Sequence, residues 1–151
     1  MVHLLILVLV QLRFAEPLEN LLRWGLTLVV DMRTPGREKE VTVIKLSGSL
    51  FSQKALGTLP KFLSLFTKIR SQGCRLVLVA GGGDLARSYI SAGRRLGADE
   101  GILDEIGIAA SRIHARLIVA GLGTAASPTI PTNLEELSRE MESNKIVILG
   151  G

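Results

Sequence analysis

From residue 41 onward, short apolar runs alternate with longer amphipathic stretches along the chain. Three of the short runs are rich in β-branched residues and bounded by small or polar residues, which is typical of strands. They lie at residues 41–46, 75–80 and 145–149. Because their side chains are almost uniformly apolar rather than alternating, they favour strands covered on both faces, as in a parallel sheet.

The longer stretches carry apolar residues at the spacing of helices. Residues 55–72 and 84–96 predict one helix each. The pattern Asn133-Leu-Glu-Glu136 is a capping box, which predicts the start of a short helix that ends near Ser143. A longer helix is predicted from six apolar residues that recur at intervals of three or four and share one face: Ile102, Ile106, Ala109, Ile113, Leu117 and Ala120.

Strands that alternate with helices predict parallel strands joined by crossover helices. We therefore expect an α/β fold, a three-layer αβα sandwich with a mainly parallel sheet. The chain contains no internal repeat and no low-complexity tract that would indicate another architecture.

The first forty residues differ from the rest. Two apolar runs, at 4–10 and 24–30, are each shorter than the ~18–20 residues of a membrane-spanning helix. No Lys or Arg precedes the first run and no small-x-small cleavage site follows it, so the segment is a poor signal peptide. We interpret residues 1–40 as an extension to a domain at 41–151, and we expect a chain that begins at Met32 to fold.

Composition narrows the classes of function. Aromatic residues make up 4% of the chain, too few for the stacking platforms that bind single-stranded nucleic acid. The single cysteine, Cys74, excludes an internal disulfide, and with two histidines it leaves the chain short of the four ligands of a structural zinc site. A net charge of +4 suits an anionic small molecule. We expect a cytoplasmic protein with no metal site of its own and with neither nucleic acid nor membrane as partner.

Small residues follow each predicted strand, in Ser47-Gly48-Ser49, Gly81-Gly82-Gly83 and Gly150-Gly151. In open α/β sheets, ligands bind outside the carboxyl ends of the strands, and glycines there let backbone N–H groups approach a ligand. The second loop opens directly into a predicted helix, whose N-terminal amides and dipole favour an anion such as phosphate. The alternative is that the three glycines only make a tight turn from strand to helix.

Charged residues near these loops fit the same interpretation. Lys45 lies in an otherwise apolar strand, where a cation is costly unless an anion pairs with it. Arg87 lies one turn into the next helix, from where its guanidinium can reach back over the loop to a phosphate. The simpler alternatives are a lysine at the sheet edge and a solvated helix arginine. Asp84 is interpreted as the N-cap of the helix, and Asp104 either complements a helix dipole or accepts from sugar hydroxyls.

Two nucleotide-binding motifs give different results. The P-loop pattern G-x-x-x-x-G-K-[ST] is absent. The dinucleotide-binding pattern is matched, because Gly81-x-Gly83-x-x-Ala86 follows a predicted strand and opens a helix. That pattern also needs an acidic residue at the end of the next strand, whereas Glu100 and Asp104, about 20 residues on, fall at a helix start. A dinucleotide-binding domain therefore stays as an alternative with incomplete support.

Four segments, read together, carry a family likeness. They are VIKLSGSLF at 43–51, VLVAGGGDLARSYI at 77–90, LDEIGIAASRIHARLIV at 103–119 and IPTNLEEL…KIVILGG at 130–151. In this order they resemble the amino acid kinase superfamily, and most of all the uridylate (UMP) kinases of the archaeal type. The combination Gly81-Gly82-Gly83-x-x-Ala86-Arg87 is the most specific, since related kinases share the three glycines without the Ala-Arg pair.

The resemblance implies an enzyme that transfers a phosphoryl group from ATP to UMP, with Mg²⁺, giving ADP and UDP. It implies that Lys45 contacts the transferred group and that Ser47 and Gly48 line the phosphate loop. It also implies that Asp104 binds the UMP ribose, with Gly107 allowing a close approach. The residues implied to hold the UMP phosphate or to line its site are Gly81, Gly82, Gly83, Arg87, Gly150 and Gly151.

Two features depart from the family pattern. His114 stands where the family usually has Asn, and the family continues well beyond the glycine pair at 150–151, with the missing part supplying the ATP site. We therefore expect the chain to be the acceptor half, to lack kinase activity alone, and to self-associate as a homo-oligomer through the uncovered strand at 145–149. A non-catalytic nucleotide- or anion-binding fragment is the alternative.

Overall fold

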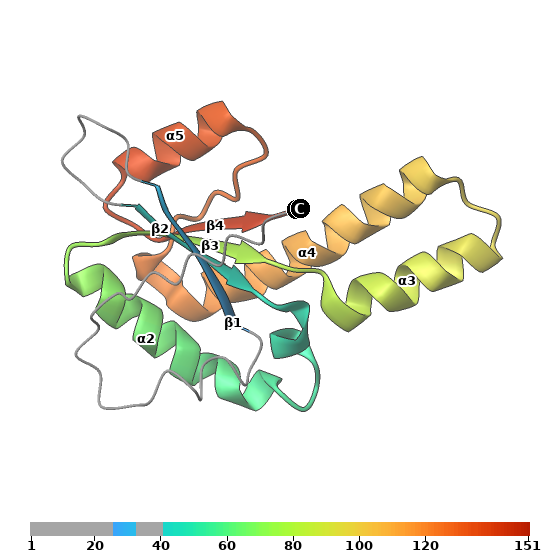
Figure 1. The fold of residues 1–151 in the computed structure, drawn as a ribbon, viewed down its shortest axis with the longest axis horizontal. Coiled ribbons are helices and arrows are strands. Elements are labelled where there is room, and N and C mark those ends of the chain that lie inside the picture. Colours follow the sequence, from blue (N-terminus) through green and yellow to red (C-terminus); the bar gives the residue numbers. More distant parts are fainter. Residues whose placement is uncertain (1–25, 33–40) are drawn as a thin grey trace, which may run out of the picture.

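The computed structural model describes residues 26–32 and 41–151 of the chain. Four strands form one sheet in the order β1 (Leu26–Met32), β2 (Val41–Leu46), β3 (Arg75–Ala80) and β4 (Val147–Gly150) (Figure 1). β2, β3 and β4 are parallel, and β1 pairs antiparallel with β2. The three parallel strands confirm the predicted runs, although β4 begins later than expected and includes Gly150, which pairs with Ala80. The apolar run at 4–10 lies outside the described residues.

Helices cover both faces of the sheet. They are α2 (Leu59–Ser71), α3 (Gly83–Arg95), α4 (Glu100–Leu122) and α5 (Leu134–Glu142), with short 3-10 turns η1 (Gly48–Phe51), η2 (Leu56–Thr58) and η3 (Gly123–Ala125). Figure 1 shows α2 and α5 on opposite sides of the strands. The main core lies between one face of the sheet, which supplies Ile44, Leu46, Leu78 and Ile148, and the helices α2 and α4. The expected αβα sandwich with a mainly parallel sheet is confirmed.

Local sequence signals account for the ends of the helices. Pro60 occupies the first turn of α2, where its missing N–H is tolerated, and Gly73 follows the helix with a φ of 92° that suits glycine. Asn133 caps α5 by accepting from the Glu136 N–H, as the capping box predicts. The Glu136 carboxylate in turn accepts from the Thr132 N–H, and this hydrogen bond is the main cause that lowers the pKa of Glu136 from 4.5.

Helix α4 buries a different face from the one that the apolar spacing singles out. The side chains of Ile102, Ile113 and Leu117 are 48%, 58% and 41% exposed. We call this the outer face of α4, made of Ile102, Ile106, Ala109, Ile113, Leu117 and Ala120. The buried residues of the helix are Leu103, Ala110, Ser111, His114, Ala115, Ile118 and Leu122. The predicted long helix is therefore confirmed, but the shared apolar face is not the one that packs on the sheet, because the helix carries two apolar stripes of similar period.

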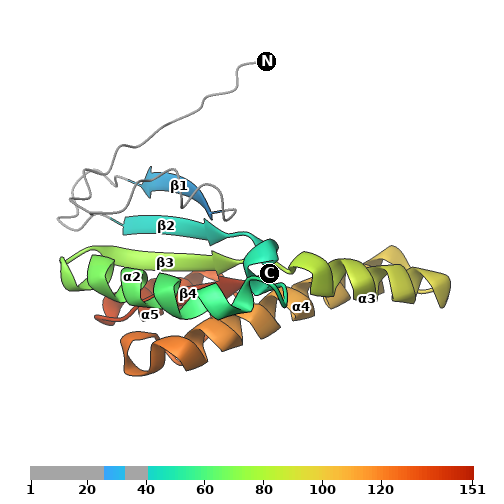
Figure 2. The same cartoon turned by 90° about the horizontal axis from the view of Figure 1, so that it is seen from below.

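α3 and the N-terminal part of α4 form a helical pair that projects beyond the end of the sheet (Figure 2). Gly97, with a φ of 82°, follows α3 and lets the chain reverse toward α4. Gly93 is the buried residue of α3, and a Cβ there would lie 2.8 Å from the Leu103 side chain. The absence of a side chain at Gly93 thus allows the two helices to pack closely. We call this pair the arm.

By length and composition the helical stretch Glu100–Ala125 would reach across a bilayer. One helix of this kind among the described residues is a weak indication of a membrane protein, because core helices of soluble proteins meet the same criterion. Packing in the main core accounts for one apolar face of α4, which includes Ala115, Ile118 and Leu122.

The antiparallel pairing of β1 with β2 brings part of the N-terminal extension into the sheet. The boundary at residue 40 stays a prediction, and a chain that begins at Met32 tests it, because it lacks nearly all of β1. We expect this chain to keep a cooperative thermal transition by circular dichroism, since the core residues that the structure describes all lie in the 41–151 segment. Loss of the transition would instead make β1 an essential part of the fold.

Candidate anion-binding site

The loops after β2 and β3 touch each other through their backbones. A Cβ built on Gly48 would lie 2.1 Å from the Gly83 Cα, and one built on Gly83 would lie 2.4 Å from the Gly48 carbonyl oxygen. Gly83 also has a φ of 56°, a conformation that favours glycine. The Gly81 N–H donates to the Leu46 carbonyl at 3.1 Å, which holds the base of the two loops together. Gly48 and Gly83 are therefore required for the close approach of the two loops, whereas the predicted approach of a ligand to these glycines stays a prediction.

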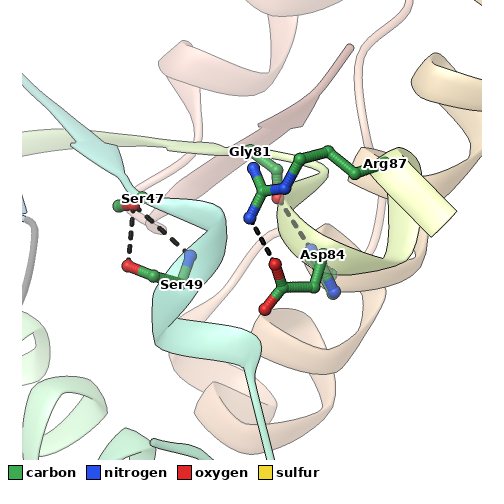
Figure 3. Close-up of polar contacts among 6 residues, drawn as sticks. Ser47, Ser49, Gly81, Asp84 and Arg87 are labelled. Atoms are coloured by element: carbon green, nitrogen blue, oxygen red, sulfur yellow. Dashed lines mark hydrogen bonds and ion pairs between the residues drawn. The ribbon is translucent and has the colours of Figure 1, made fainter.

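Ser47 organises the first loop. Its hydroxyl oxygen accepts from the Ser49 N–H at 3.3 Å and lies 2.9 Å from the Ser49 hydroxyl, so it caps the short turn η1. Figure 3 shows the Ser47–Ser49 contact on the η1 side and the Asp84–Arg87 pair on the α3 side of the place where the two loops meet. The two loops thus form the walls of one site.

The second loop leads directly into α3, whose N-cap is Gly82 without a side-chain hydrogen bond. The predicted N-cap role of Asp84 is therefore wrong, because the helix begins earlier. The N–H groups of Gly82 and Gly83 have no acceptor among the described residues. A Cβ on Gly82 would lie 2.7 Å from the Ala86 Cβ and 3.4 Å from the Gly107 carbonyl oxygen, so the loop is packed tightly over α4. Free amides at a helix N-terminus suit an anion.

Asp84 forms an ion pair with Arg87 instead of capping the helix (Figure 3). The side chains of Arg87 and Asp84 are 70% and 65% exposed, so both are available to an incoming ligand. A phosphate placed over the free amides would compete with the Asp84 carboxylate for the Arg87 guanidinium, which can bind two phosphate oxygens at once.

Three other predicted site residues, Lys45, Asp104 and Gly107, lie outside the contact between the two loops. Lys45 is exposed on β2, in register with Val79, and makes no ion pair with a described residue. Asp104 is exposed on α4 without a hydrogen bond to a described residue. Gly107 contributes its carbonyl oxygen to the packing beneath Gly82. The loops therefore come together at the glycines, whereas the roles of Lys45 and Asp104 stay predictions.

Helix α4 supports the loops from below. A Cβ on Gly150 would lie 2.9 Å from the Arg112 Cα, and the Arg112 Nε donates to the Gly150 carbonyl at 3.3 Å. Gly151, the next residue, has a φ of 101° and packs close to Ile108. His114 contacts the Gly81 carbonyl in the same way. The sequence did not identify Arg112 and His114 as site residues, and only the buried stripe of α4 would have indicated His114.

Two other features of the described residues bear on the chemistry. They contain no group of three or more His, Cys, Asp and Glu side chains that could hold a metal ion. A cavity of about 550 Å³ is lined by Thr67, Arg70, Ser71, Gly73, Arg75, Ala125, Glu142, Ser143 and Asn144. It lies at the start of β3, whereas the glycine loops lie at the opposite, carboxyl end of the strands. The cavity is therefore separate from the anion site.

The model of the amino acid kinase family matches residues 40–151. The chain belongs to the amino acid kinase family. Among members of this family, the chain is 43% identical over 110 residues to a uridylate kinase from Methanoculleus marisnigri, covering 72% of the chain and 47% of that protein. It is likewise 43% identical over 109 residues to a uridylate kinase from Pyrobaculum neutrophilum, covering 72% of the chain and 48% of that protein.

A solved structure of the amino acid kinase family has the same arrangement. The crystal structure of uridylate kinase from Archaeoglobus fulgidus matches with a TM-score of 0.66 and 33% identity, over 74% of this chain and 50% of that one. The chain thus spans about half the length of the relatives that it matches. Nothing in these matches favours the dinucleotide-binding alternative, and β4 ends in Gly150 rather than in the acidic residue which that alternative needs.

Gly48→Ala should disrupt the site, because the added Cβ would overlap the Gly83 backbone. Overpacking of this kind costs about 1–3 kcal/mol or more of the free energy of unfolding. The measurement is the midpoint of thermal unfolding. Gly57→Ala is the matched control, since a Cβ there has nothing within 4 Å and should leave the midpoint unchanged. Equal effects of the two substitutions would show that the Gly48 contact does not constrain the fold.

Proposed function

We propose that this chain forms the UMP-binding part of a uridylate kinase, which transfers the γ-phosphoryl group of ATP to UMP. The observation that carries the proposal is the contact of the Gly48 and Gly83 loops. That contact leaves the Gly82 and Gly83 amides and the exposed Arg87 together at the N-terminus of α3. These donors suit a phosphate monoester. The relatives named uridylate kinase support uracil as the base of the ligand and phosphoryl transfer as the reaction.

In this reaction a UMP phosphate oxygen attacks the γ-phosphorus of ATP, a new P–O bond forms, and the bond to the β-phosphate oxygen breaks to release ADP. The phosphate oxygen is already ionised, so the chemistry needs positioning and charge stabilisation more than a general base. We assign the UMP phosphate to Gly81, Gly82, Gly83 and Arg87. The other proposed roles are charge stabilisation on the transferred group by Lys45, contact with it by Ser47 and Gly48, and ribose binding by Asp104 beside Gly107.

ATP and Mg²⁺ are the donor and the metal that the family implies. The described residues contain no carboxylate cluster for Mg²⁺, so the fit to a protein-held ion is poor and we assign no step to it. Gly150 pairs with Ala80, the residue before the second loop, and Gly150 and Gly151 are proposed to line the space between acceptor and donor. The single cysteine fits a reducing compartment, and we place the activity in the cytoplasm.

A binding module without catalysis is the second function that the same site supports. The free amides and Arg87 need no donor nucleotide to hold an anion. A coupled assay for UMP-dependent ADP formation separates the two: UMP binding without ADP formation favours the module, and turnover favours the kinase. Saturable NADH binding without competition by UMP would contradict both.

Arg87→Ala should weaken binding of UMP far more than binding of uridine. Loss of a charge-assisted, two-point contact to the phosphate should cost roughly 1.5–3 kcal/mol of binding free energy, about 10- to 100-fold in Kd. Calorimetric titration with both ligands measures the difference. Arg95→Ala, at the other end of the same helix and bonded to Ser91, is the matched control and should change neither affinity. Equal losses for UMP and uridine would remove Arg87 from the phosphate site.

The sequence predicts self-association through the strand at 145–149, but we assign a second copy of the chain to the outer face of α4 instead. Ile102, Ile113 and Leu117 of this face are exposed, and large apolar side chains gathered on one exposed face indicate an interaction surface. Asp104 and Glu105 lie in the N-terminal half of α4, whereas Arg112 and Arg116 lie in the C-terminal half. Antiparallel packing of two copies would therefore place acidic residues beside basic ones, and parallel packing would place like charges together. Charge complementarity thus favours an antiparallel homodimer contact.

Ile113→Glu should dissociate that dimer, because it places a charge in the middle of the outer face. Losing the burial of one such side chain weakens association by about 1.5–3 kcal/mol, and the charge adds to the loss. Sedimentation equilibrium measures the mass in solution. Leu134→Glu is the matched control, since Leu134 is 80% exposed but lies on α5. A monomeric wild-type chain, or equal dissociation by both substitutions, would contradict the assignment.

A further inference from the structure

His114 lies in the middle of α4, beneath the loop that follows β3, and is 6% exposed. Its Nδ1 atom lies 2.7 Å from the Gly81 carbonyl oxygen. Its ring stacks on Phe51, the last residue of η1, with ring centroids 4.1 Å apart and the planes inclined by 8°. One buried side chain thus contacts the segment after β2 and the segment after β3.

The hydrogen bond of His114 has a defined direction. A carbonyl oxygen only accepts, so Nδ1 carries the hydrogen and donates it to Gly81. The described residues contain no cis peptide bond, and in a planar trans peptide the C=O of one residue and the N–H of the next point in opposite directions. Because the Gly81 C=O points toward His114, the Gly82 N–H points away from α4.

The Gly82 N–H is a donor that the anion site uses. Gly82 is the N-cap of α3, and its amide has no acceptor among the described residues. The Gly81–Gly82 peptide lies between two residues without a Cβ, so it rotates with little steric resistance. Rotation of this peptide would replace the Gly82 N–H by the Gly81 carbonyl oxygen, whose partial negative charge would repel an anion. The site therefore needs a contact that holds this peptide in one orientation.

We propose that His114 is a positioning residue: it holds the Gly81 carbonyl toward α4 and thereby presents the Gly82 N–H to the ligand. The stack with Phe51 holds the plane of the ring, and in that plane Nδ1 is the nitrogen that lies against the Gly81 carbonyl oxygen. The identity of the ligand as UMP rests on the proposed function, whereas the orientation of the peptide does not. The two can therefore be tested separately.

The first measurement uses the wild-type chain without ligand. A long-range ¹H–¹⁵N spectrum of the histidine rings reports which nitrogen carries hydrogen, and the His114 signals are identified by their loss in His114→Phe. We expect hydrogen on Nδ1. A His114 ring with hydrogen on Nε2 alone would overturn the proposal, whatever the chain binds.

The second measurement compares two substitutions. His114→Phe keeps a planar ring that can stack on Phe51 but has no donor, whereas His114→Asn returns an amide N–H on a shorter side chain. In His114→Phe we expect the Gly82 amide resonance to shift or broaden while that of Gly57 stays in place. We expect UMP affinity to fall about tenfold, the loss of one charge-assisted hydrogen bond, with uridine affinity unchanged. His114→Asn should recover part of the UMP affinity.

The outcomes separate this inference from the proposed function. An unchanged Gly82 resonance in His114→Phe, or equal losses of UMP and uridine affinity without recovery in His114→Asn, would reduce His114 to a packing residue. If the wild-type chain binds no UMP, the proposed function fails, and the Nδ1 hydrogen and the Gly82 resonance still decide the role of His114. If His114→Phe does not fold, His114→Asn identifies the His114 ring signals by their loss, and the wild-type ring spectrum decides the role of His114.

Discussion

The contact between the backbones of Gly48 and Gly83 is the constraint on which the candidate site depends. With no Cβ on either residue, the chain after β2 and the chain after β3 approach until their main-chain atoms touch. This approach places the capped turn of Ser47 opposite the N-terminus of α3. The site is thereby built mainly from backbone groups, which carry partial charges that need no buried ionised partner.

Side chains of helix α4 fix the orientation of the peptide groups in the loops. It packs under the ends of β3 and β4, and its side chains hold carbonyl oxygens of both following loops: His114 that of Gly81 and Arg112 that of Gly150. Holding the carbonyls below leaves the amides to face outward, because the two groups of a peptide point in opposite directions. Arg87, one turn into α3, remains exposed and paired with Asp84 until an anion competes for it.

The sequence predicts the strands, most helix ends and the glycine loops, because each rests on local preferences: β-branched runs, capping residues and positions that tolerate no Cβ. It does not predict the buried face of α4, since Leu103, Ala110 and Ile118 recur at nearly the same period as the outer face, and only packing against the sheet decides between them. The contact of His114 with Gly81 joins residues on separate elements, so no local pattern reveals it. The sequence does not predict the pairing of β1 with β2 either, because it also joins two separate elements.

The arm gives the two walls of the site unequal local stability. The wall after β2 continues into Leu50 and Phe51, which are buried in the main core, whereas the wall after β3 continues into α3, whose buried residue is Gly93. Segments with little buried apolar surface open with less free energy than the whole domain. We therefore expect the amide hydrogens of α3 to exchange with solvent through local opening, and those of β3 to exchange only through global unfolding. A ligand that joins the two walls makes this opening rarer in proportion to its occupancy, so the arm becomes a reporter of binding.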